Sequence, residues 1–444
     1  MTGWGRTAPS VARLVDATDT ELDATTLGDL AGSRGVIARG LGRAYGDPAQ
    51  NAGGTVVQLR PGQIVLDTVT GEATVGGGVG FDELLRYLVP RGWFVPVTPG
   101  TRFVTVGGAI ASDIHGKNHH ADGSFGAHLR SMTLLTADGE RRSVTEASDP
   151  SLWWATIAGM GLTGIIIDAT FRVLPIETSR CLVDTERIPN LDALLERMES
   201  GDHLYRYSVA WVDLVASGAS LGRSVLTRGD HATITDLDEA GTHLDDPLAF
   251  SPPALASVPR GVPNLLNRLS VSAFNELWYR KAPRSHQGLE SITGFFHPLD
   301  MVGSWNRLYG SAGFLQYQFV VPFEAVDTLR TIVREVAASG QASFLAVLKR
   351  MGGANDGMLS FPTPGWTLTM DLPAGVAGLG TLLARLDELV LDAGGRHYLA
   401  KDATATPAML RAEYPRLDEW LDVRRAVDPH GVWMSDQARR LDLY

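Results

Sequence analysis

The segment from Pro99 to Gly116 combines an almost bare backbone with a group of polar residues at its end. Small residues occupy positions Gly100, Gly107, Gly108, Ala109, Ala111, Ser112 and Gly116. Without bulky side chains, backbone N–H groups can reach the phosphates and ring edges of a ligand. The segment runs into a polar cluster formed by Asp113, His115, Lys117, Asn118, His119 and His120. This order of features predicts a cofactor cradle beside a reaction centre.

A second glycine-rich loop lies upstream, at residues 39–47, and reads Arg-Gly-Leu-Gly-Arg-Ala-Tyr-Gly-Asp. Its amides and Arg43 could clasp a pyrophosphate, although the same residues could form a simple glycine-rich hairpin. Tyr45 within it could equally serve packing. Two such loops separated by a strand-rich segment favour a dinucleotide that is held by loops, not by a single Rossmann turn.

Size and charge narrow the class of protein. A chain of 444 residues is long enough for two domains. A net charge of −11 without a dense Lys/Arg run excludes a nucleic-acid binder. The single cysteine, Cys181, excludes internal disulfides and cysteine-rich metal sites. We find neither an apolar N-terminal stretch of signal-peptide length nor a window long enough to span a bilayer, and we expect a soluble or peripherally attached protein on the cytoplasmic side.

Periodicity predicts an α+β chain. Up to about residue 175, short strands are expected at 35–38, 55–58, 64–67, 73–76, 131–136 and 165–173, with helices at 81–89 and 150–158. Further along, strands at 205–212 and 314–321 alternate with helices at 190–199, 323–338 and 376–393, which fits a second domain around an antiparallel sheet. Residues 244–270 contain five prolines and predict a long mobile loop. A last helix is expected over 408–425.

Histidines and lysines are the candidate chemical groups. A zinc site at His115, His119 and His120 is a competing interpretation, but two adjacent histidines point apart and no further ligand completes a tetrahedron, so we expect no metal. Lys117, Lys349 and Lys401 have apolar or glycine neighbours. Each could be a solvated surface charge. A lysine at the end of an apolar strand can also lie in a cleft, where it stabilises an anion or shifts its own pKa.

Two amides, Gln316 and Gln318, share one face of a predicted strand, with Tyr317 on the other. They could bind a sugar or a flavin edge, or they could face solvent on an ordinary strand.

Together these residues resemble the vanillyl-alcohol-oxidase (PCMH-type) FAD oxidoreductases and, among them, the decaprenylphosphoryl-ribose 2′-oxidase family. The similarity runs nearly end to end, in segments 2–10, 38–47, 104–120, 276–281, 296–301, 313–319 and 400–402. It implies a two-domain FAD-binding fold of the α+β class. Residues 1–179 and 396–444 would form the FAD-binding domain, and 180–395 an inserted substrate domain built on an antiparallel sheet with flanking helices.

The resemblance implies FAD held without a covalent bond, although His115 stands where some relatives attach theirs. The cofactor would contact Ala38, Arg39, Gly40, Leu41, Gly42, Arg43, Ala44, Tyr45, Gly46, Asp47, Gly100, Thr105, Val106, Gly107, Gly108, Ser112, Asp113, Ile114, His115, Ile166, Tyr398 and Lys401. Lys401 would lie near the flavin N1/O2 edge, where a cation stabilises negative charge.

The resemblance also implies catalytic roles for Lys401, Lys117, Tyr45 and His115, with the base left open among Lys401, Lys117 and Tyr45. Substrate would contact Gln316, Gln318, Lys349, Phe296, Thr367, Thr369 and Trp211. Three of these depart from the family pattern. Thr369 replaces the usual cysteine, Thr367 the usual asparagine and Phe296 the usual tyrosine. A threonine cannot form the thiol adduct of nitroaromatic inhibitors, so we expect natural resistance to them.

The implied reaction is oxidation of the 2′-hydroxyl of a polyprenylphosphoryl ribose to the keto sugar, the first half of an epimerisation toward cell-wall arabinan. The implied partners are an NADH-dependent short-chain reductase, a quinone-type electron acceptor and the inner-membrane surface, on the periplasmic side by family assignment. Arg280 and Lys281 could join Lys117 and Lys349 at the phosphate. Two alternatives stay open: an alditol or aldonolactone oxidase of the same fold that uses oxygen, and a non-catalytic flavin-binding subunit.

Overall fold

Two small sheets form the first part of the chain. The computed structural model describes residues 1–252, 256–264, 266–341 and 343–444. A parallel sheet has the order β1 (Arg13–Ala17), β3 (Thr55–Leu59), β2 (Val36–Ala38). An antiparallel sheet has the order β4 (Ile64–Asp67), β5 (Glu72–Gly76), β9 (Ile165–Arg172), β7 (Leu129–Leu135), β8 (Arg141–Val144). The short strands β6 (Trp93–Phe94) and β10 (Leu174–Pro175) pair separately. The six strands predicted in this part are therefore confirmed, within one or two residues at each end.

The helices of this part are α1 (Ala24–Ala31), α2 (Phe81–Leu88), α3 (Val106–Ala111), α4 (His119–Asp122) and α5 (Pro150–Thr156). In α2 the apolar residues Phe81, Leu84, Leu85 and Leu88 recur at helical spacing, and all four are buried. Helix α3 was not predicted, because its glycines favour a turn; the side chain of Thr105 caps its first turn by accepting from the amide of Gly108.

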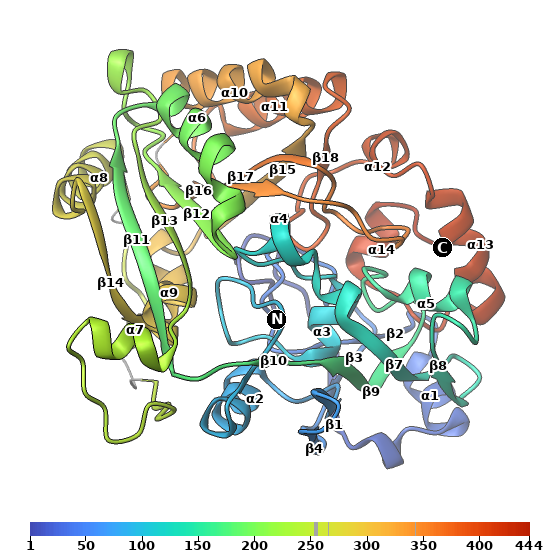
Figure 1. Cartoon of the computed structure of the whole chain (residues 1–444). Helices are drawn as coiled ribbons and strands as arrows, with labels where there is room; N and C mark the ends of the chain where they lie inside the picture. The colour runs from blue at the N-terminus through green and yellow to red at the C-terminus, as the bar shows by residue number, and fades with distance from the viewer. Residues whose placement is uncertain (253–255, 265, 342) are drawn as a thin grey trace.

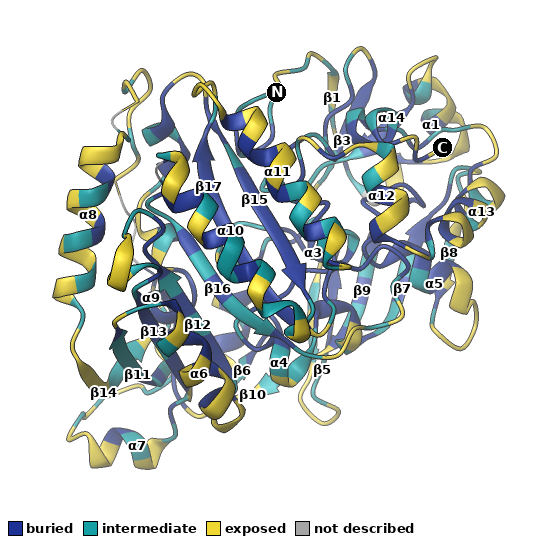
Figure 2. Cartoon of the chain, turned by 90° about the horizontal axis from the view of Figure 1, so that it is seen from above, coloured by how far each residue is buried: buried dark blue, intermediate teal, exposed yellow. Residues whose placement is uncertain are grey.

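One large antiparallel sheet dominates the rest of the chain. Its order is β14 (Ser285–Ser291), β11 (Arg180–Ile188), β13 (Ser224–His231), β12 (Tyr207–Val212), β16 (Ala346–Met351), β17 (Gly365–Pro373), β15 (Phe314–Val321), β18 (Arg396–His397). Helices α6 (Leu191–Gly201), α10 (Val326–Ser339) and α11 (Leu379–Asp392) cover one face (Figure 2). The other α-helices between β11 and β15 are α7 (Ile234–Glu239), α8 (Arg268–Lys281) and α9 (Ile292–Phe296).

Strand alternation gives the large sheet two different faces. In β15 and β17 the side chains of Tyr317, Phe319, Leu368 and Met370 pack against the helices. Their neighbours in sequence point to the opposite side, because successive side chains of a strand alternate. The predicted separation of Gln316 and Gln318 from Tyr317 is confirmed, and the alternative of a solvent-facing strand is wrong, since all three residues are buried.

The C-terminal segment returns to the N-terminal part. Helices α12 (Pro407–Glu413), α13 (Leu417–Val427) and α14 (Asp436–Arg440) share one hydrophobic cluster with α5 and β2, and α13 lies against α5 (Figure 1). Trp420 and Trp433 are fully buried there, and Trp433 pairs with Val36 of β2. This position is compatible with the expected discontinuous domain, while the boundaries at 179/180 and 395/396 stay predictions.

Two expected elements are corrected. The single helix expected over 408–425 is broken into α12 and α13, because Pro415 lacks an N–H donor and its ring disfavours a helical Tyr414. The loop expected over 244–270 ends at Asn267, whose side chain caps α8 in a capping box with Ser270. Residues 253–255 and 265 of that loop lie outside the described residues. Within the described part, none of the helices combines the length and the apolar character needed to cross a membrane.

A buried ionic cluster joins the C-terminal segment to the large sheet. His397 Nδ1 lies 2.5 Å from Glu413 Oε1, and its Nε2 lies 2.7 Å from the hydroxyl of Tyr317, which donates to Asp387 at 2.8 Å. Burial disfavours the imidazolium, but the hydrogen bond and charge of Glu413, with the charge of Asp387, outweigh it and raise the pKa of His397.

We expect the Glu413→Gln substitution to lower the free energy of unfolding by about 1–3 kcal/mol near pH 6. Because the folded pKa of His397 is raised, its contribution is complete below about pH 6.5 and is lost as the pH rises through the folded value. The destabilisation should therefore shrink near pH 9. Urea unfolding followed by tryptophan fluorescence measures it, with the exposed Glu419→Gln as control. Equal destabilisation at both pH values would contradict the assignment.

Candidate active site

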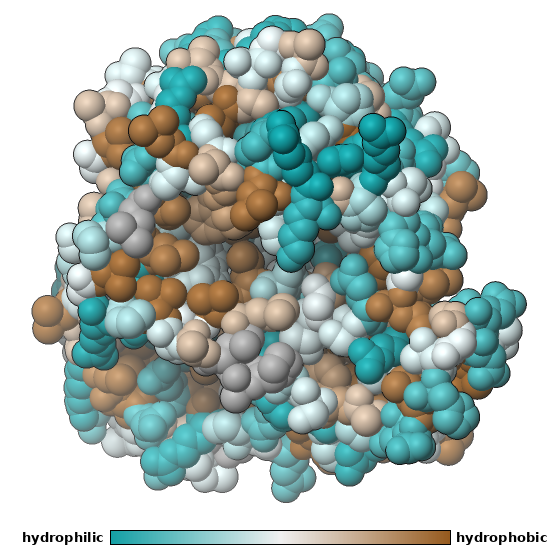
Figure 3. All heavy atoms as spheres, turned by 90° about the vertical axis from the view of Figure 1, so that its left-hand side faces the viewer, coloured by the Kyte–Doolittle hydropathy of each residue, from teal (hydrophilic) through white to brown (hydrophobic). Residues whose placement is uncertain are grey.

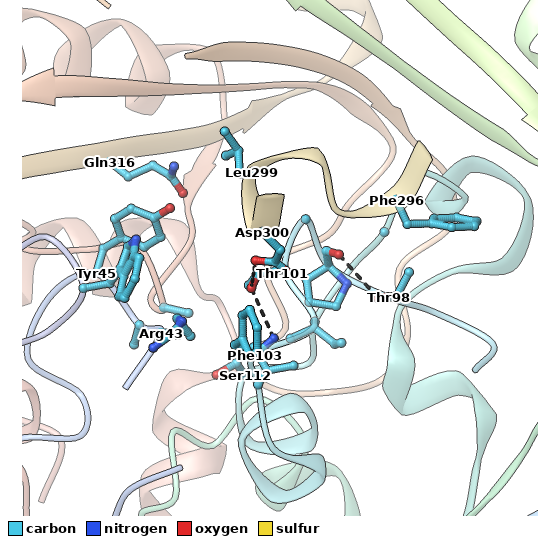
Figure 4. Close-up of a pocket in the computed structure, with 18 of the residues that line it drawn as sticks. Arg43, Tyr45, Thr98, Thr101, Phe103, Ser112, Phe296, Leu299, Asp300 and Gln316 are labelled. Carbon is cyan, nitrogen blue, oxygen red and sulfur yellow. Dashed lines mark hydrogen bonds between the residues drawn. The ribbon is translucent and has the colours of Figure 1, made fainter. Parts of the chain in front are cut away.

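A cavity of about 1100 Å³ lies between the N-terminal part and the uncovered face of the large sheet. Drug-sized ligands occupy pockets of roughly 300–1,000 Å³, so this one has room for a dinucleotide and part of a second ligand. Arg43 and Tyr45 lie on one side of it, and Thr101 with Asp300 on another (Figure 4). Both regions of the chain thus contribute to one site.

The loop after β2 presents free backbone amides to this cavity. Its ends are fixed, since Arg39 N donates to Val57 O at 2.8 Å and Tyr45 N to Ala400 O at 3.0 Å. Among the described residues, no acceptor serves the amides of residues 40–44, all of which line the cavity. Gly42 adopts a φ of +65°, which a side chain would strain. A row of unpaired N–H groups is the arrangement that binds a phosphate.

The amides of α3 do not offer such a surface. Val106 N donates to Val79 O at 3.0 Å, Gly107 N to Gly77 O at 2.8 Å and Gly108 N to Thr105 Oγ1 at 3.2 Å. The expectation that these three amides face a ligand is therefore wrong. Glycine is needed here for close packing instead, since a Cβ at Gly107 would lie 3.1 Å from Gly77 O.

Most residues expected at the cofactor line the cavity. These are Ala38, Arg39, Gly40, Leu41, Gly42, Arg43, Ala44, Tyr45, Gly100, Thr105, Gly107, Gly108, Ser112, Ile114, His115, Ile166, Tyr398 and Lys401. Gly46, Asp47, Val106 and Asp113 lie outside the lining that the described residues form. Gly46 packs against Asp402 O, Asp47 pairs with Arg440 at 2.7 Å, and Val106 belongs to the core.

Asp113 supports the cavity wall from behind. Its carboxylate accepts hydrogen bonds from Ser124 Oγ, Ser360 Oγ, Asn355 Nδ2 and Gly126 N. Burial raises its pKa, and these four bonds oppose that shift. Because four donors already engage its carboxylate and Asp113 lies outside the lining that the described residues form, the structure gives Asp113 a supporting position and not a ligand-facing one.

The uncovered face of the sheet supplies the opposite wall. Trp211 from β12, Lys349 from β16, Thr369 from β17, and Gln316 and Gln318 from β15 all line the cavity. Phe296, the last residue of α9, also lines it and packs on Tyr207 and Phe94. Thr367 is fully buried outside the lining formed by the described residues; its hydroxyl donates to Phe319 O at 2.8 Å and lies 3.3 Å from Gln318 Nε2.

His115 is held neutral between two of these residues. Lys349 Nζ lies 3.1 Å from its Nδ1, and Gln318 Nε2 lies 3.0 Å from its Nε2. Burial first, and then the charge of Lys349, hold the pKa of His115 well below its usual range. One ring nitrogen thus faces Gln318 and the other faces Lys349, and the direction of each hydrogen bond follows the tautomer of the neutral ring.

Three buried amines surround the cavity. Burial lowers the pKa of Lys401 to about 7, that of Lys349 to about 7 and that of Lys117 to about 8. Lys117 Nζ donates to Phe295 O, whereas the described residues offer Lys401 Nζ no acceptor. Lys401 Nζ lies 4.0 Å from the ring centre of Tyr45. Amines with such pKa values can give or take a proton near neutral pH.

Behind Lys401 a second carboxylate is buried. Asp371 accepts from Gln316 Nε2 at 2.6 Å and from the Tyr309 hydroxyl at 3.2 Å. Burial raises the pKa of Asp371 to about 7, and its charge partly offsets the depression of the pKa of Lys401. Asp300, also absent from the expected site, binds Thr101 Oγ1 at 2.6 Å and Arg102 N at 2.7 Å, and so fixes the segment after α9 to the cavity wall.

Lys281, expected with Arg280 at the phosphate of the substrate, also lines the cavity, whereas Arg280 lies outside the lining that the described residues form. The chain contains only four lysines among 39 basic residues, and all four, Lys117, Lys281, Lys349 and Lys401, line this cavity. Arginine keeps its charge when buried, whereas lysine can lose its proton, so this distribution marks where proton exchange is possible.

Comparisons with known proteins agree with this geometry. A family profile described as "FAD binding domain" matches residues 17–145, and one described as "D-arabinono-1,4-lactone oxidase" matches residues 369–441. The chain is 48% identical to decaprenylphosphoryl-beta-D-ribose oxidase of Mycolicibacterium smegmatis, over 100% of this chain and 97% of the relative. The chain belongs to the decaprenylphosphoryl-β-D-ribose oxidase family. Alditol oxidase of a Streptomyces species is 23% identical over 92% of this chain and 90% of its own length.

Membership makes the chain an FAD-dependent oxidoreductase and confirms the expected α+β FAD-binding fold. The residues present fit FAD, because the free amides of residues 40–44 suit its pyrophosphate and the cavity is large enough for the whole dinucleotide. When bound, FAD supplies a two-electron acceptor to this site.

We expect Gly40→Ala to lower the flavin content of purified protein about tenfold, because overpacking typically costs about 1–3 kcal/mol. The added methyl would clash with Thr105 Oγ1 and would displace the hydroxyl that caps α3. The ratio of flavin to protein absorbance after dialysis measures the effect. Gly28→Ala is the matched control, since no atom lies within 4 Å of its Cβ. Full flavin content in Gly40→Ala would show that the cradle tolerates the displacement.

Proposed function

We propose that this chain oxidises the 2′-hydroxyl of decaprenylphosphoryl-β-D-ribose to the 2′-keto sugar. The supporting observation is a polar, lysine-lined cavity that opens to the surface along an aromatic wall. The relative from M. smegmatis carries this substrate in its name. A substrate with a sugar, a phosphate and a long apolar chain needs a polar end, a cationic part and an apolar exit, and the cavity supplies all three.

The aromatic wall connects the surface with the catalytic end. Ring centres follow one another from Trp278 to Phe274 at 6.0 Å and on to Phe344 at 5.8 Å. The ring centre of Trp305 lies 6.5 Å from that of Phe344. Phe314 packs on Trp305, and its ring centre lies 5.4 Å from that of Tyr45. Of these residues, all except Phe314 belong to the cavity lining. Aromatic side chains bury large apolar areas, so this wall fits a prenyl chain better than a free polyol.

Oxidation removes a hydride from the sugar carbon and a proton from its hydroxyl, and leaves a carbonyl. We assign the proton to Lys401, whose pKa of about 7 and unengaged amine suit a base. Tyr45 suits the role less, because burial raises its pKa well above the usual value. Lys117 is already engaged with Phe295 O. Once protonated, Lys401 would also offset negative charge in the cavity. Gln318, Gln316 and Lys349 would orient the sugar. His115 would hold Gln318 of β15 and Lys349 of β16 in place, because its two ring nitrogens contact these two side chains.

The remaining parts of the proposal concern organisation and partners. Residues 1–179 with 396–444 would bind FAD without a covalent bond, and 180–395 would bind substrate. The electrons removed from the sugar would pass to a quinone-type acceptor. An NADH-dependent short-chain reductase would then reduce the keto group from the opposite face of the sugar, which completes an epimerisation for arabinan synthesis. Peripheral contact with the inner membrane would give access to the lipid-linked substrate, on the periplasmic side if the chain follows its family.

Anaerobic addition of a prenylphosphoryl ribose should bleach the flavin absorbance, and Lys401→Gln should slow bleaching about a hundredfold to ten-thousandfold. In the unaltered protein the rate should rise with pH through about 7, as the amine loses its proton. Lys401→Arg keeps the charge but cannot accept the proton, so it should be as slow as Lys401→Gln. If Lys401→Arg bleached as fast as the unaltered protein, Lys401 would contribute only its positive charge and would not be the base.

The same experiment separates the alternative functions. Bleaching by free polyols with rapid peroxide release in air would favour an alditol or aldonolactone oxidase. A yellow protein that no alcohol bleaches would favour a non-catalytic flavin-binding subunit.

Thr369 lines the cavity opposite Gln318 of the neighbouring strand, and a hydroxyl there cannot form a thiol adduct. We expect a nitroaromatic inhibitor to leave the intact mass of the protein unchanged during turnover. Thr369→Cys should gain one covalent adduct per chain, whereas the control Thr367→Cys, at a buried position outside the lining of described residues, should gain none. Stoichiometric labelling of the unaltered protein would refute the expected resistance.

A further inference from the structure

We propose that the outward apolar face of α8 docks on an anionic lipid bilayer and holds the cavity mouth against it. The inference rests on the proposed function, in which the substrate is lipid-linked, and it names the surface through which that substrate arrives. We call the residues Leu269, Phe274, Leu277 and Trp278 the α8 patch.

Helix α8 has its apolar side turned outward. Of its fourteen residues, all described, Val271 and Asn275 are buried. Leu269 is 83% exposed, Leu277 69%, Trp278 43% and Phe274 42%. Positions 269, 273 and 277 recur every four residues, with 274 and 278 beside them, so they form one continuous stripe. A stripe of this width normally packs against a core.

Polar contacts hold α8 to the protein from its other side. Asn275 Nδ2 donates to Asp213 Oδ1 at 2.7 Å in the interior. Glu276 pairs with Arg223 at 2.6 Å, and Arg223 in turn pairs with Asp213 at 2.8 Å. The guanidinium of Arg223 also lies 4.7 Å from the ring centre of Tyr279. The helix is thus anchored through its polar face, which leaves the apolar face free for another contact.

The α8 patch adjoins the entrance to the cavity. Phe274 and Trp278 belong to both the patch and the cavity lining, and Val302, 44% exposed, lines the same entrance. Apolar side chains gather around a hollow on this side of the molecule (Figure 3). The aromatic series that ends at Tyr45 begins at Trp278. A lipid chain leaving a bilayer at the patch would therefore enter the cavity along an apolar surface.

Charge identifies the partner as anionic. Residues 260–286 contain five basic residues, Arg260, Arg268, Arg280, Lys281 and Arg284, all of them exposed, in a chain of net charge −11. The one acidic residue in the segment 260–286, Glu276, already pairs with Arg223 and Arg280. An amphipathic helix with Trp, Phe and Leu on one face and basic residues around it is the pattern of an interfacial helix.

Two other occupants fit less well. A second copy would bring two groups of five basic residues together, and like charges repel. A prenyl chain of the bound substrate would cover Phe274 and Trp278, but Leu269 and Leu277 lie outside the lining formed by the described residues. A bilayer covers all four at once.

The test compares two double variants by cosedimentation with lipid vesicles. Leu269→Glu with Leu277→Glu removes two patch residues outside the cavity. Val69→Glu with Leu204→Glu is the matched control, because these side chains are 94% and 70% exposed elsewhere. We expect the FAD-loaded protein to bind vesicles that contain phosphatidylglycerol, and the patch variant to bind them at least about tenfold more weakly. The control should bind normally, and salt should weaken binding.

A second pair of measurements keeps this proposal separate from the proposed function. With a short-chain, water-soluble prenylphosphoryl ribose the patch variant should bleach its flavin as fast as the unaltered protein. With the decaprenyl substrate embedded in vesicles it should be slower by about the loss in binding. If the soluble substrate bleached the flavin of neither the unaltered protein nor the variants, the proposed function would be wrong. The vesicle-binding result would not be affected.

Three outcomes would overturn the docking surface. The patch variant could bind vesicles normally, or the unaltered protein could bind phosphatidylcholine alone as well as the anionic mixture. In the third outcome, the unaltered protein does not bind vesicles but forms a concentration-dependent dimer that the patch variant does not form. A second copy of the chain would then be the occupant. The double variant Arg260→Gln with Arg284→Gln should bind anionic vesicles more weakly, mainly at low salt. Unchanged binding at low salt would contradict the proposed attraction between the basic residues and the anionic lipid.

Discussion

The two unlike faces of the eight-stranded sheet are the constraint on which the site depends. One face is apolar and must be covered, and α6, α10 and α11 cover it. The same strands then have to turn their alternate residues to the other side. Trp211, Lys349, Thr369 and the two glutamines reach the cavity for this reason. Helix packing on one side thus positions polar chemistry on the other.

Burial of amines is the second physical theme. Removing three lysines from water lowers each pKa toward neutrality, and neighbouring positive charges add to the shift for Lys349. A cavity built with arginines would keep its charge at any working pH. The restriction of lysine to this cavity therefore gives the site groups that can change protonation state, beside Arg39 and Arg43, which keep their charge.

Much of the fold was accessible from periodicity. The strands up to residue 173 and helix α2 follow from alternation and from helical spacing that ends near Pro90. The predicted boundaries of helices were wrong where a single residue determines whether a helix starts or ends. Pro415 breaks a helix that its apolar pattern would continue, and Asn267 starts one inside a proline-rich stretch. The site residues were found largely through resemblance, while Asp300 and Asp371 escaped because their partners are distant in sequence.

The sequence alone determined which residues are apolar, which segments carry bare backbone and where the lysines stand. It could not determine what each of them would meet. The amides of residues 40–44 stay free, while those of α3 are used by Val79 and Gly77, although both loops are equally rich in glycine. The stripe on α8 has the spacing of a core helix but faces outward. Hydrogen-bond partners and burial depend on residues far along the chain, so only the tertiary structure decided them.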